Sequence, residues 1–423
     1  MNTLQSFPRT LQYYKFCAYG FLKNLRLFDI FFILFFREAG LSFLQIGFLY
    51  SIRQITINIL EIPSGLIADA IGRKQSLLFS MFAYLFSFIM FYVAEIYFLF
   101  SAAMILFGIG EAFRSGTHKA MILEYLKLNN LLSVKTRYYG STRSWSQFGS
   151  AISSLLAMVV VFNTGSYRQL FIFSAVPYLL DFVLLSTYPR ALNGKLTDGK
   201  EALNLRILIN RFRHTFFDFS RMIRNGDAFQ SIFSAATYIA LYKTLKDYLQ
   251  PVLKATALSL PVLMALQNEK RAAILVGLIY FAIFIINSIA SRHAWRLETK
   301  FSNLGKTIDW AYLVGVLSVL AAAFFLIFNW QIAASVIFIG LYVIQNIRRP
   351  LVVSFLSRHI SSNVMASGLS AESQLETILI ALLAPVVGYL VDLLGLGGGI
   401  AISGLFFLAI YPLVRLQKLE VVK

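Results

Sequence analysis

Long apolar segments separated by short polar connections recur along the whole chain of 423 residues. A membrane-spanning helix needs about 20 predominantly apolar residues, and the segments are of that length. They fall into two sets of six, divided by the only long polar stretch. The predicted spans are residues 11–36, 43–70, 75–95, 97–126, 136–163, 166–189, 227–254, 271–294, 304–328, 331–358, 363–393 and 397–416.

This pattern predicts an all-α polytopic membrane protein with twelve transmembrane helices in two six-helix halves, residues 1–189 and 227–423. Residues 190–226 form the predicted cytoplasmic linker. Apolar residues recur there at helical spacing, with arginines elsewhere on the turn, which predicts either an amphipathic helix on the inner membrane surface or a solvated linker helix. The apolar residues are Leu205, Leu208, Phe212, Phe216, Phe219 and Ile223.

Composition agrees with a membrane protein, because 58% of the residues are hydrophobic and only 14% are charged, against about 25% charged in soluble proteins. The net charge of +18 comes from basic residues that follow every second apolar segment. Such loops lie on the cytoplasmic side, so we expect both termini in the cytoplasm, the plasma (inner) membrane as the location, and no nucleic-acid partner. Cys17 is the single cysteine, which excludes an internal disulfide framework.

A turn motif follows the second predicted span. Gly65 allows two helices to approach closely, and Asp69 is suited to accept hydrogen bonds from a helix N-terminus. Gly72 permits the positive φ that reverses the chain, and Arg73 and Lys74 mark the cytoplasmic side.

The spacing of glycine, aspartate, glycine, arginine and lysine over residues 65–74 resembles the loop motif of the major facilitator superfamily of secondary transporters. The resemblance implies that this motif latches the two halves on the cytoplasmic side. It also implies that the first, fourth, seventh and tenth helices line a cavity, while the third, sixth, ninth and twelfth face lipid. The predicted spans three, eight, nine and twelve carry no charge, which largely agrees with that order.

Charges inside the first two spans are expected to face the cavity, because exposure to lipid would be costly. Lys23, Arg26 and Asp29 are spaced i, i+3 and i+6, which places them on one side of a continuous helix. We expect Asp29 to pair with Arg53 of the second span. Glu61 shares the broad polar face of Arg53.

The fourth span carries Glu111, Arg114 and His118 on one helical stripe. Glu111 and Arg114 are expected to pair on their own helix, or to bind across to Arg143 of the fifth span. Such a carboxylate can take up a proton when its cationic partner moves away, which is what proton coupling needs. A permanently paired structural network is the alternative.

The second half carries a further group of charges. Lys243 and Asp247 are expected to form an i, i+4 pair, and Arg348 lies in the tenth span. Glu372 and Glu376 stack four residues apart in the eleventh span, so either Arg348 or the adjacent arginine compensates them, or one glutamate is protonated. This glutamate pair is the second candidate proton site.

By its resemblance, the chain is expected to be a secondary active transporter, not an enzyme, that moves a drug or metabolite by alternating access. Export, proton coupling and a monomeric state are expected, with no cofactor and no metal. An uncoupled facilitator or an uptake permease for an anionic or zwitterionic metabolite is the main alternative, and a transporter-like sensor or scaffold is a further one. Cations slightly outnumber acids among the candidates, which favours an anionic, zwitterionic or amphiphilic solute.

Overall fold

The described part of the chain is helical and contains no strand. It separates into two compact units that do not follow chain order, because residues 30–55 cluster with the C-terminal part of the chain. Unit 1 comprises residues 1–29, 56–160 and 168–212, and unit 2 comprises residues 30–55, 161–167 and 213–423. The computed structural model describes residues 8–194, 226–262, 264–300, 303–359 and 365–416.

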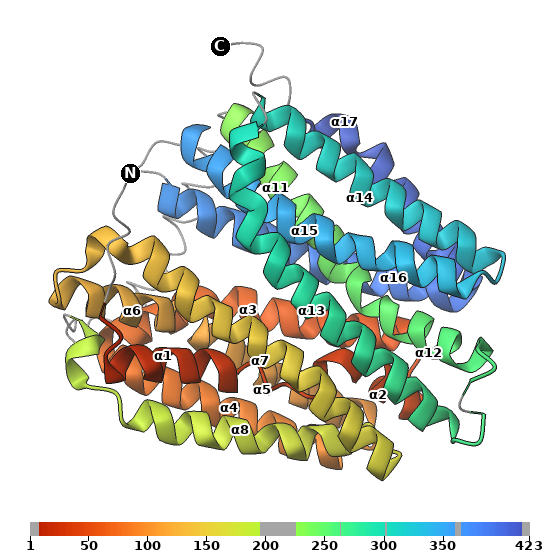
Figure 1. The fold of residues 1–423 in the computed structure, drawn as a ribbon, viewed down its shortest axis with the longest axis horizontal. Coiled ribbons are helices and arrows are strands. Elements are labelled where there is room, and N and C mark those ends of the chain that lie inside the picture. Colours follow the sequence, from red (N-terminus) through yellow and green to blue (C-terminus); the bar gives the residue numbers. More distant parts are fainter. Residues whose placement is uncertain (1–7, 195–225, 263, 301–302, 360–364, 417–423) are drawn as a thin grey trace. The chain divides into compact units, whose positions relative to one another are not determined.

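Figure 1 labels the α-helices. Unit 1 contains α1 (Leu11–Leu22), α4 (Arg73–Val93), α5 (Tyr97–Arg114), α6 (Thr117–Leu128), η2 (Leu132–Val134), most of α7 (Lys135–Thr164), α8 (Gln169–Ser186) and η3 (Arg190–Asn193). α3 (Phe43–Ile71) contributes its first part to unit 2 and its second part to unit 1. Unit 2 further contains α2 (Phe32–Glu38), α11 (Gly226–Leu245), η4 (Lys246–Tyr248), α12 (Leu249–Ser259), α13 (Asn268–Lys300), α14 (Leu304–Ile327), α15 (Gln331–His359), α16 (Met365–Ala409) and α17 (Tyr411–Val414), while η1 (Asp29–Phe31) spans the boundary between the units.

Each of the twelve predicted spans coincides with helical residues in the described ranges, which confirms the predicted fold class. Eight of the described helices are long and apolar enough to cross a membrane. Three spans are broken where a continuous helix was expected: the first after Leu22, the fourth after Arg114 and the seventh at η4. Spans eleven and twelve are joined in α16, which is kinked at Gly395 with φ +72°. The predicted helix at residues 205–223 lies outside the described residues.

Helix α4 shows how the third span divides between lipid and core. Serines on one face donate hydrogen bonds to carbonyl oxygens of α5, with distances of 3.1, 2.7 and 2.9 Å for Ser76, Ser80 and Ser87. These bonds join α4 tightly to α5, which suits a helix pair in a membrane. Large apolar side chains are exposed along another face, as expected for a span that faces lipid: Phe79, Phe82, Phe86, Ile89 and Val93.

Close packing in unit 2 joins the first part of α3 to α16. A Cβ atom on Gly388 would lie 2.2 Å from the carbonyl oxygen of Phe43, and one on Gly47 would lie 2.4 Å from that of Ala384. The Asp392 carboxylate accepts hydrogen bonds from the backbone N–H groups of Phe43 and Leu44, at 3.0 and 2.7 Å. A carboxylate at a helix N-terminus satisfies unpaired N–H groups and complements the helix dipole.

Gly47 and Gly388 allow close contact between helices, whereas the sequence predicted this role for Gly65. Gly65 is exposed, and a Cβ atom there would have no neighbour within 4 Å among the described residues. No described residue of unit 1 packs against Gly65, so the expectation that Gly65 brings two helices together stays a prediction.

We predict that Gly388→Ala destabilises the protein, because its new methyl group would meet backbone atoms of α3 that cannot move independently. Overpacking of this kind costs about 1–3 kcal/mol. Gly340→Ala in α15 is the matched control, since a Cβ atom there meets no atom within 4 Å in the described part of the chain. Thermal unfolding of the two purified variants measures the difference, and equal midpoints would contradict the prediction.

Candidate functional site

The first predicted span is broken between α1 and η1, where residues 23–28 are not helical. Backbone groups in such a break need other partners within a membrane, and α8 supplies them. The Tyr178 hydroxyl donates to the carbonyl oxygen of Lys23 at 2.9 Å, and the Ser174 hydroxyl accepts from the N–H of Leu27 at 2.9 Å. The expected helical face of Lys23, Arg26 and Asp29 is thus wrong, because a helical spacing does not apply across the break.

Arg26 and Arg114 share the carboxylate of Glu111. One oxygen of Glu111 lies 2.6 Å from Arg26, and the other lies 2.5 Å from Arg114. We call these residues the arginine–glutamate triad. Both guanidinium groups also donate to the Tyr84 hydroxyl, at 3.2 and 3.1 Å, and Arg26 donates to Tyr178 at 2.5 Å.

The contacts of the triad show which of the two expected partners binds Glu111. The pairing with Arg114 on the same helix is present, whereas Arg143 forms no ion pair with it. Arg26 is a partner that the sequence analysis did not identify, because the break after α1 redirects its side chain. Two guanidinium groups against one carboxylate leave the triad with a formal charge of +1.

The fourth predicted span is also broken, and this separates His118 from the triad. Ser115 and Gly116 divide α5 from α6, and Gly116 adopts φ +74°. The expected single stripe of Glu111, Arg114 and His118 is therefore wrong. His118 instead stacks on Tyr19 of α1, with ring centroids 3.8 Å apart.

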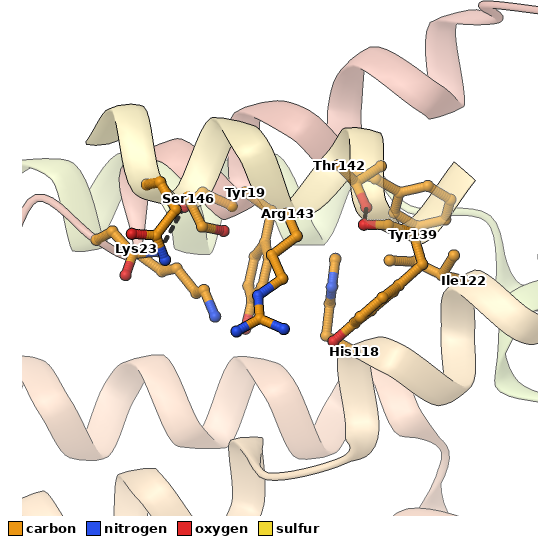
Figure 2. Close-up of a pocket in the computed structure, with 12 residues that line it drawn as sticks. Tyr19, Lys23, His118, Ile122, Tyr139, Thr142, Arg143 and Ser146 are labelled. Atoms are coloured by element: carbon orange, nitrogen blue, oxygen red, sulfur yellow. Dashed lines mark hydrogen bonds between the residues drawn. The ribbon is translucent and has the colours of Figure 1, made fainter. Parts of the chain in front are cut away.

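A pocket of about 220 Å³ lies between α1, α6 and α7 in unit 1. Figure 2 shows the side chains of Lys23 and Arg143 extending into the same space, beside Tyr19 and His118. We call it the cationic pocket. Its lining residues are Phe16, Tyr19, Gly20, Lys23, Asn24, His118, Ile122, Tyr139, Thr142, Arg143, Ser146 and Gln147.

The charges of the cationic pocket are uncompensated. Its twelve lining residues include Lys23, Arg143 and a histidine but no aspartate or glutamate. Within the described residues, neither Lys23 nor Arg143 forms an ion pair, in contrast to the two arginines of the triad. Arg143 is exposed, so that its guanidinium is accessible to a solute. An uncompensated pair of cations in a concave site is suited to bind an anion.

The turn motif lies in unit 1, at the junction of α3 and α4. Gly72 has φ +106°, which confirms the expected chain reversal. Asp69 accepts no hydrogen bond from the described residues, and the side chain of Asn193 instead accepts from the N–H of Lys74 at 2.9 Å. The expected role of Asp69 as a cap is thus taken by Asn193.

The two basic residues of the turn motif bind neighbouring elements of unit 1. Arg73 lies 3.8 Å from Glu124 of α6. The Lys74 ammonium donates to the carbonyl oxygens of Ser186 and Tyr188, at 2.5 and 2.9 Å.

The candidate charges of unit 2 form pairs that agree in part with the expected ones, because the arginine adjacent to Arg348 binds Glu372. Glu376 binds Lys243, and Glu372 binds Arg349, so each glutamate has its own cation. Asp247 instead binds Lys246 at 2.5 Å. The expected pair of Lys243 with Asp247 is wrong, because α11 ends at Leu245 and η4 changes the helical register.

Arg348 is 1% exposed and lies among aromatic and serine side chains. Its guanidinium stacks over Tyr238 at 4.4 Å and donates to the carbonyl oxygen and the hydroxyl of Ser234, at 3.2 Å each. Cation–π contacts stabilise a desolvated arginine in such surroundings.

The remaining candidates are divided between the units. Asp29 is exposed at the start of η1 in unit 1, whereas Arg53 lies in unit 2 and stacks over Tyr50 at 4.9 Å. Their pairing would join the two units and stays a prediction. Glu61 is partly buried in the part of α3 that belongs to unit 1.

Tyrosines are the site residues that the sequence analysis missed. Tyr84 and Tyr178 surround the triad, and Tyr19 and Tyr139 line the cationic pocket. The chain contains 21 tyrosines, so residue type alone could not single these out. The placement of Tyr178 three residues before the buried Asp181 is the nearest sequence signal.

Comparison with known structures supports the fold. The nucleoside transporter NupG is 16% identical, with a TM-score of 0.68 and coverage of 98% of both chains. A POT family transporter in complex with 5-aminolevulinic acid is 14% identical, with a TM-score of 0.71 and coverage of 99% of this chain and 98% of that one. A D-xylose-proton symporter is 14% identical, with a TM-score of 0.65 and coverage of 93% and 95%.

A search of curated protein sequences returned no match. The sequence pattern that defines the Major Facilitator Superfamily matches residues 24–374, which includes the turn motif, the triad and most of the cationic pocket. The chain therefore belongs to the Major Facilitator Superfamily.

Proposed function

We propose that this protein is a proton-coupled secondary transporter that moves a small organic solute with an anionic group across the plasma (inner) membrane. The observation that carries the proposal is the cationic pocket, where Lys23 and Arg143 meet without an acidic neighbour among the lining residues. Charged residues within membrane spans are costly to expose to lipid and mark solute or ion pathways. An anionic solute would supply the missing negative charge.

The size of the cationic pocket supports a small solute. Its volume of about 220 Å³ lies below the range of about 300–1,000 Å³ that is usual for drug-sized ligands. Aromatic rings of Phe16, Tyr19 and Tyr139 line it beside the cations, so that an apolar body next to an anionic group would also find contacts.

We propose alternating access by movement of the two six-helix halves, residues 1–189 and 227–423. The contacts of α3 with α16 in unit 2 support this proposal, because they join segments of different halves through close glycine packing and through backbone N–H groups of α3 that donate to the Asp392 carboxylate. The turn motif of Gly65, Asp69, Gly72, Arg73 and Lys74 would act as the cytoplasmic latch. These contacts would have to separate and re-form in each cycle.

Proton coupling is the part of the proposal that needs a carboxyl group able to gain and lose a proton. Glu111 is fixed between two guanidinium groups, and Glu372 and Glu376 each have a cationic partner. These contacts support the structural-network alternative for the triad. One of the solved structures similar to this chain is named a proton symporter, which supports coupling in general.

The competing functions make different predictions for transport. An uncoupled facilitator or uptake permease would move its solute without protons, and a sensor or scaffold would not move it at all. Export, the direction expected from the family, stays a prediction that a flux measurement decides.

We predict that reconstituted protein produces a pH change inside proteoliposomes when it is supplied with its solute. Pools of organic acids, amino acids and drugs would be screened with an internal pH dye, and pools with anionic members are expected to respond. Protein-free liposomes are the control. Solute flux without any pH change would contradict coupling and favour the facilitator.

We predict that Lys23→Gln and Arg143→Gln each raise the KM for the active solute. A hydrogen bond to a charged group contributes about 1.5–3 kcal/mol, so the loss corresponds to about tenfold or more. Lys127→Gln on the exposed face of α6 is the matched control and is expected to leave the KM unchanged. Unchanged KM values for both pocket variants would exclude the pocket as the solute site.

We predict that Glu111→Gln lowers thermal stability, because it leaves the guanidinium groups of Arg26 and Arg114 without their shared carboxylate. Removing one partner of a fully buried ion pair costs about 3–5 kcal/mol, which is an upper bound for these side chains, because they are 16–20% exposed. Glu124→Gln is the matched control, since Glu124 is similarly exposed but has a single, longer contact among the described residues, at 3.8 Å from Arg73. Equal unfolding midpoints of the two variants would refute the structural role of Glu111.

A further inference from the structure

Asp181 is a buried carboxyl group that belongs neither to the triad nor to the residues that line the cationic pocket. It lies in the middle of α8 and has no exposed surface. Neither of its oxygens has a hydrogen-bond partner in the described part of the chain. A carboxylate buried without hydrogen bonds is far costlier than a neutral carboxylic acid, which makes the protonated form the stable one in this arrangement.

Asp181 lies on the side of α8 that binds the break in the first span. Ser174, Tyr178 and Asp181 are spaced i, i+4 and i+7, so they lie on one side of the helix. Ser174 and Tyr178 bind the backbone of Leu27 and Lys23, respectively. The backbone of Lys23 is therefore held by the side of α8 that carries Asp181.

Cations and tyrosines surround Asp181. Its electrostatic neighbours are Tyr19 from α1, Lys23 from the break that follows α1, Arg114 from α5, and Tyr188 just after α8. α4 also packs on α8 and presents Tyr84, whose hydroxyl is bound by the triad. Arg114 forms an ion pair with Glu111, whereas Lys23 has no ion pair among the described residues. Lys23 is thus the cation that is available to Asp181.

We propose that Asp181 binds the coupled proton, and that Lys23 links this proton to the anionic group of the solute. The proposal rests on the proposed function. Lys23 lines the cationic pocket and has a flexible side chain, so it can serve either the solute or Asp181. In the structure described here Lys23 points into the pocket, as Figure 2 shows.

Charge balance gives the direction of the linkage. With a proton on one oxygen of Asp181, the carboxyl group is neutral and the Lys23 ammonium is free to bind an anion. When that O–H bond breaks and the proton leaves to water, the Asp181 carboxylate competes with the anion for Lys23. The proton and the anion therefore favour each other's binding, and this coupling is reciprocal. The expected transport mode is symport of the anion with a proton.

The proton on Asp181 can be measured without knowing the solute. Infrared difference spectra of the full-length protein in lipid, taken between acidic and alkaline buffer, should contain a band of a buried carboxylic acid. Asp181→Asn should lack this band. Asp309→Asn is the matched control, because Asp309 is also buried but its carboxylate accepts hydrogen bonds from the N–H of Leu416 at 2.8 and 3.0 Å. The same band in Asp181→Asn would overturn the proposal.

Transport separates this inference from the proposed function. With the solute found by the screen, Asp181→Asn should reduce solute-driven proton flux by about tenfold or more, within the range of coupling between linked sites. Exchange of labelled for unlabelled solute should continue, because exchange needs no net proton movement. Full proton flux in Asp181→Asn, or loss of exchange in a folded variant, would overturn the role of Asp181.

Two further outcomes are decisive. If the unmodified protein transports no solute with protons, the proposed function fails, while the infrared measurement still tests the proton on Asp181. If Asp181→Asn does not fold, Asp181→Glu replaces it, because this variant keeps the carboxyl group and should shift the infrared band. An unshifted band in Asp181→Glu would overturn the proposal.

Discussion

The break in the first span imposes the constraint on which the candidate site depends. A helix that stops inside a membrane leaves backbone N–H and C=O groups without partners, and each must be satisfied by protein. Ser174 and Tyr178 of α8 do this for Leu27 and Lys23. Because these bonds fix the backbone on both sides of Arg26, they also direct Arg26 into the triad and Lys23 into the pocket.

The contrast between paired and unpaired charges gives the site its chemical character. Arg26 and Arg114 share Glu111, and Arg349 and Lys243 each bind a glutamate. These contacts compensate buried charge and hold helices together. Lys23 and Arg143 form no such pair within the described residues, although they line a common pocket. A charge that the protein leaves uncompensated is a better indication of a solute than a charge inside a span as such.

Helix ends explain why two expected helical faces and one expected ion pair were wrong. Spacing arguments assume a continuous helix, and they failed for Asp29, His118 and Asp247, each of which follows a break. The break at Gly116 has a sequence signal, because a glycine there adopts positive φ. Residues 23–28 contain neither glycine nor proline, so their break could not be predicted from local sequence. The break is accompanied by tertiary partners, because α8 binds backbone groups of Lys23 and Leu27.

The sequence by itself determined the membrane class, the number and approximate limits of the spans, and the chain reversal at Gly72. These properties depend on the length of apolar segments and on local backbone preference, and both follow from residues that are neighbours in the sequence. Only the tertiary structure decided which charges pair. Arg26 meets Glu111 across 85 positions, and Lys243 meets Glu376 across 133. The rotation of each helix and the position of each break set such contacts, and both depend on packing against distant segments.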